Sequence, residues 1–411
     1  CNLYEYYGYY YADVNDCRDP RMTYAQTNDI ERTSTELRIQ SNNDSGFNWV
    51  LGAFQETNEK VTDVDYIQPG SSHINQRWWE ADLDRKGEID AIFGEMYLDI
   101  NDKTSATIGL RKYDQSMKLK AVDGYYGTLS YGLTDGNFKS NEDGIIPKIA
   151  LKHNISDDIM IYGSYSEGYR PSGVNRPRPN SSGFSVPETY DPDYLDSLEI
   201  GFKSTLGDGQ LILNGAYYMM DWTNYQTSTF NTDITSVAYT ENVGNAEING
   251  FELNALYAFN DSTDISFYIN RMDPKLSDDY YYVSGELGAN AGNRLAGMPK
   301  LSYYMSLDKD FTLMGKPAFL ILDYSYTGLR YTSYENGAYR LPEYAIANLR
   351  AGFDNENTSI EFYISNLTDE DGYLSRYDDF SAVGSSGYSG FGVRRTGTKP
   401  RVLGVRFRYR Y

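Results

Sequence analysis

The chain has 411 residues, with 37 Lys and Arg against 58 Asp and Glu, which gives a formal net charge of −21. That much acid argues against nucleic acid as a partner, because a protein that binds phosphate backbones needs a basic face. The mean hydropathy is −0.59, and no apolar run approaches the roughly 18 residues of a membrane helix, which excludes a helical membrane protein. The 41 Tyr and 37 Gly indicate strands and turns instead.

Cys1 and Cys17 are the only cysteines. In an oxidising compartment a disulfide between them would close a local loop and contribute roughly 3 kcal/mol. The sequence is compatible with a disulfide between these two cysteines and also with two free thiols. The sequence has no initiating Met, signal peptide or transit segment, so we expect a processed, cut or partial chain and draw no cytoplasmic location from it.

Apolar residues recur at every second position through most of the chain. Near the C-terminus Leu403, Val405 and Phe407 fall on one face of a strand, with Gly404 and Arg406 between them on the other face. We expect about fifteen strands, most of them near the length of an inclined membrane strand. Their expected ranges are 29–40, 47–60, 88–99, 104–114, 145–155, 159–167, 194–206, 211–226, 244–259, 263–270, 298–310, 318–329, 342–353, 358–366 and 399–411.

Loop lengths decide between a soluble sandwich and a membrane barrel, because strands alternate in both. Turns of a few residues alternate with long connections, which are expected at 61–87, 116–143, 168–193, 227–243, 271–297, 330–340 and 368–398. This asymmetry is typical of an outer-membrane barrel, with short periplasmic turns and long extracellular loops. Since the last strand ends on the short-turn side, residues 1–28 fall in an external loop, and the chain looks truncated.

Seven segments, in a fixed order along the chain, carry a resemblance to a known family. They are 36–41, 47–54, 162–173, 190–203, 242–252, 364–369 and 399–411. Each is weak alone, but together they extend over most of the chain. In this order they resemble the C-terminal barrel portion of a TonB-dependent outer-membrane receptor.

The resemblance implies an all-β, transmembrane antiparallel barrel of roughly 22 strands with an N-terminal plug. Residues 1–411 would supply about fifteen of these strands as one barrel portion, because no plug-like region or TonB-contacting box precedes the barrel. The implied function is uptake of a scarce nutrient, most often a ferric siderophore, powered by the TonB-ExbB-ExbD complex through the plug. Glycan or cobalamin cargo, a passive porin complete at about 16–18 strands, and a secreted glycan-binding β-protein remain alternatives.

Aromatic clusters and arginines in the expected external loops are the candidate ligand contacts. Flat rings can stack on sugars or catecholate-like groups, although such rings also decorate the membrane girdle. Arginines can attract an anionic ligand, although we favour solvated loop charge as the explanation for them. The candidates are Trp78, Trp79, Tyr125, Tyr126, Arg170, Arg176, Tyr280, Tyr281 and Tyr282.

The last strand resembles the terminal signal that the barrel assembly machinery reads. The resemblance also implies that outer-membrane lipid and lipopolysaccharide surround the barrel. The residues of this signal are Leu403, Val405, Phe407, Tyr409 and Tyr411. An ordinary lipid-facing strand would have the same pattern. Arg406, Arg408 and Arg410 should face the lumen and form internal ion pairs, because an arginine near the bilayer midplane costs roughly 2–4 kcal/mol.

The sequence predicts no enzyme active site, cofactor or metal site. His73 and His153 are far apart and have no cysteine partners, which makes a poor zinc or haem site. No GxSxG elbow occurs. The acidic clusters, such as Asp278 and Asp279, lack the spacing of a calcium loop and are typical of solvated loops.

Overall fold

The computed structural model describes residues 23–42, 44, 46–67, 77–125, 134–176, 185–229, 238–355, 357–377 and 394–410. Cys1, Cys17, Tyr126 and Tyr411 lie outside these ranges, as do the side chains of Trp78, Trp79 and Tyr125. Within the described ranges no helix is long and apolar enough to cross a membrane.

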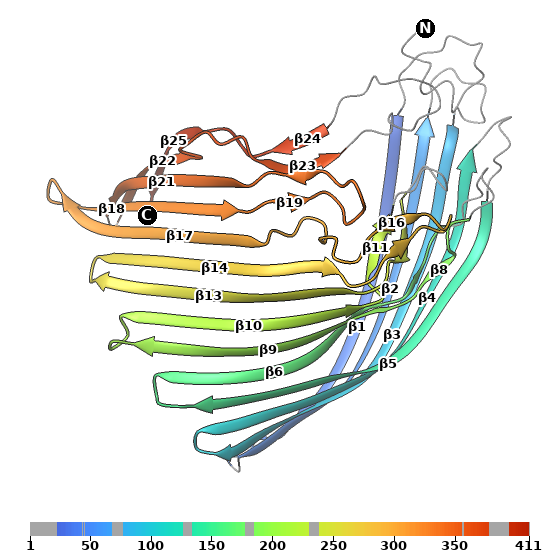
Figure 1. Ribbon diagram of the computed structural model, residues 1–411, viewed down its shortest axis with the longest axis horizontal. Helices are drawn as coiled ribbons and strands as arrows, with labels where there is room; N and C mark the ends of the chain where they lie inside the picture. Colours follow the sequence, from blue (N-terminus) through green and yellow to red (C-terminus); the bar gives the residue numbers. More distant parts are fainter. Residues whose placement is uncertain are drawn as a thin grey trace, which may run out of the picture.

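Fifteen strands form one curved antiparallel sheet in which each strand pairs with the next one along the chain (Figure 1). The predicted all-β fold and fifteen strands are confirmed, and every expected range overlaps one strand of this sheet. The strands are β1(Thr23–Gln40), β2(Phe47–Ile67), β3(Arg77–Asn101), β4(Thr104–Tyr125), β5(Thr134–Asn154), β6(Ile159–Arg170), β9(Asp193–Leu206), β10(Leu211–Thr223), β13(Ala246–Asn260), β14(Thr263–Leu276), β17(Leu301–Leu313), β18(Lys316–Thr327), β21(Tyr344–Asp354), β22(Thr358–Ser365) and β25(Val402–Tyr409).

The long connections contain five small two-stranded ladders of their own. These ladders lie at one end of the main sheet, opposite the end with the short turns (Figure 1). The strands in them are β7(Gly173–Val174), β8(Thr189–Tyr190), β11(Gln226–Thr229), β12(Tyr239–Asn242), β15(Tyr280–Tyr281), β16(Leu287–Ala289), β19(Arg330–Tyr331), β20(Arg340–Leu341), β23(Tyr373–Tyr377) and β24(Arg394–Gly397).

Two of the expected long connections were wrong in extent. Most of 61–87 and 116–143 is strand, because β2 to β5 continue far past the apolar part of the sheet. Trp78, Trp79 and Tyr125 therefore have strand backbones, not loop backbones. Cross-strand ion pairs hold these polar extensions, such as Lys86 with Glu59 at 2.9 Å and Arg77 with Asp65 at 2.8 Å.

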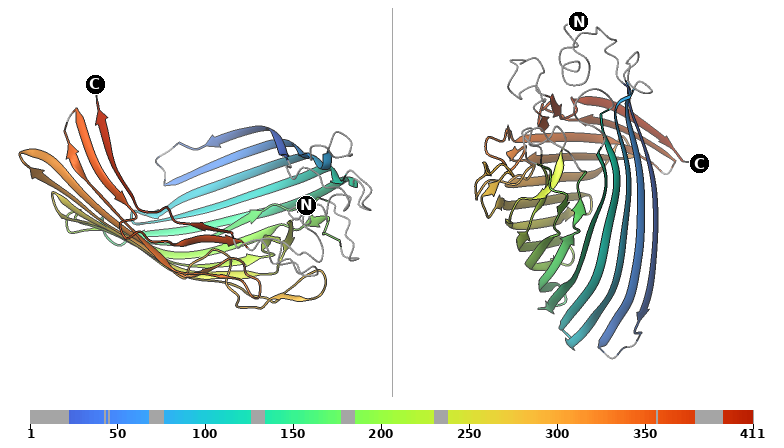
Figure 2. Two further views of the ribbon diagram at one scale, coloured as in Figure 1. Left: turned by 90° about the horizontal axis from the view of Figure 1, so that it is seen from above. Right: turned by 90° about the vertical axis from the view of Figure 1, so that its right-hand side faces the viewer.

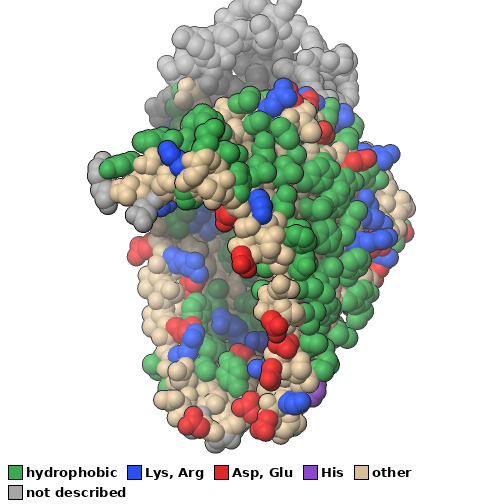
Figure 3. All heavy atoms as spheres, turned by 90° about the vertical axis from the view of Figure 1, so that its left-hand side faces the viewer, with side chains coloured by type: hydrophobic (Ala, Val, Ile, Leu, Met, Phe, Trp, Pro, Cys, Tyr) green, Lys and Arg blue, Asp and Glu red, His purple; other side chains and the backbone are tan. Residues whose placement is uncertain are grey.

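The convex face of the sheet is apolar from the first strand to the last. The register brings residues of the same face together across neighbouring strands, as where Tyr217 lies between Ile200 and Phe251. These side chains are 49%, 60% and 41% exposed, so the apolar face is uncovered within the described chain. Figure 3 shows hydrophobic side chains gathered on this side and a hollow on the other.

The concave face is polar and holds ion pairs between strands. Lys148 contacts Glu95 at 2.9 Å, and Arg406 contacts Glu361 at 2.7 Å. Arg406 thus pairs on the inner face as expected, while Leu403, Val405, Phe407 and Tyr409 lie exposed on the outer face. A sheet with an apolar outer face and a polar inner face is the pattern of a transmembrane barrel wall.

The described sheet is open, with β1 and β25 at its two edges (Figure 2). All neighbouring strands are antiparallel, and fifteen is an odd number, so β1 and β25 run in the same direction. Antiparallel pairing throughout a closed barrel therefore requires an odd number of additional strands between these two edges.

Candidate functional site

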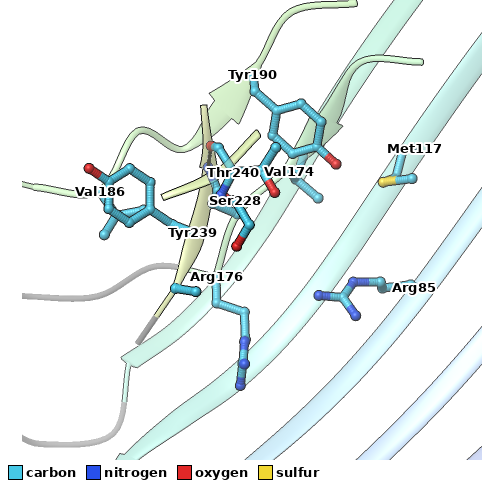
Figure 4. A pocket seen from close by; sticks show the side chains of 11 residues that line it. Arg85, Met117, Val174, Arg176, Val186, Tyr190, Ser228, Tyr239 and Thr240 are labelled. Atoms are coloured by element: carbon cyan, nitrogen blue, oxygen red, sulfur yellow. Dashed lines mark hydrogen bonds between the residues drawn. The ribbon is translucent and has the colours of Figure 1, made fainter. Parts of the chain in front are cut away.

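A cavity of about 230 Å³ lies near the end of the sheet that carries the long connections. Arg85 of β3 and Met117 of β4 line it from the barrel wall, while Arg176 and Tyr190 belong to the β6–β9 connection. Tyr239 of β12 completes its far side. Figure 4 shows that these side chains come from widely separated parts of the sequence.

An apolar contact fixes the β7–β8 ladder against the barrel wall. Val174 is 5% exposed and packs in a buried cluster with Leu83 of β3 and Leu119 of β4. Burial of these side chains removes apolar area from water and so holds the connection over the inner face. The cavity therefore has one wall of rigid strand and one wall of packed connection.

Asn175 joins the two hairpins that frame the cavity. Its side-chain nitrogen donates to the carbonyl oxygens of Pro187 and Thr240 at 2.9 and 2.7 Å, and its side-chain oxygen accepts from the Thr240 amide at 2.9 Å. Asn175 is 6% exposed, so losing these hydrogen bonds would leave buried polar groups unpaired. The two hairpins thus form one unit around the cavity.

A buried carboxylate anchors both ends of the β6–β9 connection. Asp193 accepts hydrogen bonds from Arg170, from the Trp222 indole at 2.9 Å and from the Gln226 amide at 2.9 Å. The Arg170 guanidinium also lies over the Trp222 ring, 4.9 Å from its centroid. Arg170, predicted as a ligand contact, thus has a structural partner and stands outside the cavity lining.

Two guanidinium groups, those of Arg85 and Arg176, bring positive charge to the cavity. Burial and the neighbouring Arg176 lower the pKa of Arg85, although a guanidinium stays charged at any physiological pH. Within the described chain Arg85 has no ion pair with a carboxylate. Burial also raises the pKa of Tyr190, so its phenol remains a hydrogen-bond donor. Two guanidinium groups with a phenol beside them suit an anionic ligand rich in oxygen.

Three further predicted contacts, Tyr280, Tyr281 and Tyr282, lie apart from this cavity. Tyr280 is 4% exposed and donates to Glu241, and Tyr282 donates to Glu335 at 2.8 Å, so both belong to the packed core of the connections. Tyr281 is 56% exposed beside them. Among the predicted residues whose side chains the structure describes, Arg176 alone lines the cavity. The described side chains contain no group of three or more His, Cys, Asp or Glu able to hold a metal ion.

A second, larger hollow of about 720 Å³ lies on the outer apolar face. It forms over Gly163 and Gly215, which lack side chains, and Ile200 and Phe251 stand at its sides. Because its lining is mostly apolar and faces away from the concave side, it does not resemble a site for a polar cargo in the lumen.

The family model described as TonB dependent receptor-like, beta-barrel matches residues 2–367. The chain belongs to this family. TonB-dependent receptor barrels are outer-membrane proteins of bacteria, and they are transport receptors, not enzymes. The assignment agrees with the apolar outer face, the polar inner face and the one-sided long connections.

Among proteins of known sequence, a probable TonB-dependent siderophore receptor of Acinetobacter baumannii, PiuA, is 24% identical over 336 residues, which cover 80% of this chain and 42% of that protein. The ferric yersiniabactin uptake receptor FyuA of Yersinia pestis matches the fold with a TM-score of 0.75 at 16% identity, over 94% of this chain and 55% of that one. The siderophore receptor PiuA of A. baumannii gives 0.69 at 17% identity, over 93% and 56%. The chain thus spans about half the length of these TonB-dependent receptors.

Sequence reasoning missed most of the cavity. Arg85 and Met117 were not singled out, since both lie in a stretch expected to be a loop. Asn175, Tyr190 and Tyr239 meet only because two connections fold onto the same wall. The one usable signal was Arg176, in the arginine-rich connection after β6.

Proposed function

We propose that this protein is the barrel portion of a receptor that takes up an anionic iron complex of the ferric siderophore class, powered by TonB. The observation that carries the proposal is the cationic cavity, where Arg85 is half-buried without a carboxylate partner. Such a site favours hydroxamate, catecholate or carboxylate oxygens over a neutral sugar or a cation. The siderophore receptors that share the fold support the same class of cargo.

The proposed arrangement has the short turns in the periplasm and the long connections outside the cell. The family's usual architecture would complete residues 1–411 with further strands and a plug, to roughly 22 strands. TonB-ExbB-ExbD would act through that plug, and the barrel assembly machinery would insert the barrel by reading the β25 face. In this arrangement the cavity opens toward the lumen on the external side, where cargo arrives first.

Binding to the full-length receptor tests the proposal. Purified protein in detergent is titrated with a panel of ferric complexes that differ in charge, followed by tryptophan quenching. We expect submicromolar binding for at least one anionic ferric complex, and at least tenfold weaker binding by Arg85→Gln. Arg111→Gln is the matched control, because Arg111 lies on the inner face of β4, next to β3 that carries Arg85, but outside the cavity. Equal affinity of Arg85→Gln and the original protein would rule out the cavity as the binding site of the ferric complex.

A passive porin is the competing function, and such a barrel would need at least one strand besides the fifteen described to join β1 and β25 with antiparallel pairing. The porin alternative predicts steady ion conductance in planar bilayers. The plugged receptor predicts none at rest.

A further inference from the structure

Three lysines form one row across the outer face of β3, β4 and β5. The register places Lys86 opposite Lys118, and Lys118 opposite Lys139. Side chains directly opposite on neighbouring antiparallel strands have their Cβ atoms about 4.5–5.5 Å apart, and like charges there destabilise the pair. We call Lys86, Lys118 and Lys139 the lysine row.

Only one lysine of the row, Lys86, forms ion pairs with nearby carboxylates that the structure describes. Lys86 contacts Glu59 at 2.9 Å and Glu88 at 3.3 Å. Lys118 and Lys139 are exposed, and neither has an ion pair with any residue that the structure describes. Two adjacent ammonium groups thus face outward without a counter-charge, which is the local condition for binding an external anion.

The lysine row stands well beyond the apolar part of the wall. Lys86 and Ile92 share the outer face of β3, and Ile92 belongs to the last apolar positions before the polar extension. Six residues at about 3.3 Å each separate them by about 20 Å along the strand. With a strand tilt of about 35–45°, this corresponds to about 15 Å along the membrane normal.

An ordinary phospholipid does not reach that far. The headgroup layer adds only about 5–8 Å to each side of the hydrocarbon core. On the same face, a row of carboxylates lies between the apolar positions and the lysine row. It consists of Asp90, Asp114 and Asp143. Headgroup phosphates at the hydrocarbon boundary would meet these carboxylates, whereas anionic groups farther out would meet the lysines.

We infer that the lysine row binds the anionic core sugars of lipopolysaccharide in the outer leaflet. This inference rests on the proposed orientation, with the long connections outside the cell. The core oligosaccharide is an anionic chain that extends beyond the lipid headgroup layer, so its phosphate and carboxylate groups meet Lys118 and Lys139 at the required height. The contact holds the polar extensions of β3 to β5 against the carbohydrate layer and involves no part of the lumenal cavity.

Equilibrium binding of lipopolysaccharide to the full-length receptor in nonionic detergent tests the inference. The variant Lys118→Gln/Lys139→Gln should bind about 30-fold more weakly at low salt, because each lysine near an anionic lipid surface contributes to the attraction. The control Lys103→Gln/Lys316→Gln removes the same charge from two exposed lysines beside the short turns and should bind like the original protein. Lys118→Arg/Lys139→Arg should retain binding.

Two comparisons decide the ligand. Lipopolysaccharide stripped of core phosphate and carboxylate groups should bind the original protein as weakly as intact lipopolysaccharide binds Lys118→Gln/Lys139→Gln. Equal binding of both lipopolysaccharides, or a glutamine variant that loses an acidic protein partner while retaining lipopolysaccharide, would overturn the inference. Failure of ferric-complex binding would leave these results unchanged, so the two proposals fail separately.

Discussion

Arg170 and Asp193 face each other across the last pair of the β6–β9 ladder, at the point where the strands leave the barrel wall. The Asp193 side chain is 1% exposed, whereas the Arg170 side chain is 46% exposed, so the carboxylate is the buried member of the ion pair. Asp193 also accepts from Trp222 and from the backbone of Gln226, so one carboxylate ties the β6–β9 connection to the end of β10 and the start of the β10–β13 connection. This arrangement fixes the frame on which Arg176 and Tyr190 approach the cavity.

Replacing Asp193 by Asn should loosen that frame. The amide cannot accept from all the donors that converge on the carboxylate, so we expect a loss of about 1.5–3 kcal/mol in the local opening free energy. Hydrogen exchange of residues 171–176 and 226–229 should accelerate, while exchange in β13 stays constant. Unchanged protection at both segments would mean that the ion pair has no anchoring role.

Gly144 makes room for the Tyr113 ring on the inner face. A Cβ at Gly144 would lie 2.6 Å from the Tyr113 hydroxyl oxygen, and Tyr113 stacks on Tyr169 with ring centroids 4.0 Å apart. Gly144→Ala should therefore lower the free energy of unfolding by about 1–3 kcal/mol. Urea unfolding in detergent measures this, with Gly168→Ala as the control because nothing lies within 4 Å of its Cβ. The prediction fails if both variants are equally stable.

The packed core of the connections should open at alkaline pH. Burial raises the pKa of Tyr280, Tyr282 and Tyr334. Below about pH 10, the ordinary tyrosine pKa, packed and open forms are both protonated and the stabilisation is complete. Above it the open form releases protons and the packed form does not, so stability falls as pH rises.

Limited proteolysis between pH 8 and pH 12 measures this opening. Cleavage within 277–300 and 328–343 should begin above about pH 10, while the main strands stay resistant. Tyr281→Phe should not change the onset, because this ring is 56% exposed and outside the packed core. Cleavage that starts near pH 8 would contradict the assignment.

The outer face of β25 should control the amount of protein that reaches the membrane. Phe407 is 66% exposed on that face, and Arg408 follows it on the inner face. Phe407→Ser should lower the amount in isolated outer membranes several-fold, because it removes an apolar contact with lipid and interrupts the terminal pattern. Arg408→Ser should have little effect. Equal levels of both variants would rule out a terminal signal on this face.

Alternation with period two located every strand that crosses the apolar part of the sheet, because an apolar outer face leaves the same pattern in each one. The ends of β2 to β5 were not predicted as strands, since the outer face is no longer apolar beyond Ile92. The inner-face apolar residues there, such as Leu83 and Leu119, stand among charged residues and form only short runs. The ion pair of Lys86 with Glu59 helps to stabilise the strand pairing in this region. The period-two pattern did not predict the cavity either, for another reason. Arg85 and Tyr190 are more than 100 positions apart and meet only through the folding of a connection onto the wall.

Uptake of radioactive iron by cells producing the full-length receptor distinguishes energised transport from passive entry. We expect that an anionic ferric complex accumulates, that collapse of the proton-motive force or deletion of TonB abolishes the accumulation, and that Arg85→Gln reduces it at low complex concentration. Accumulation that persists without TonB, or iron entry that rises in proportion to concentration without saturation, would contradict energised transport and favour a passive channel.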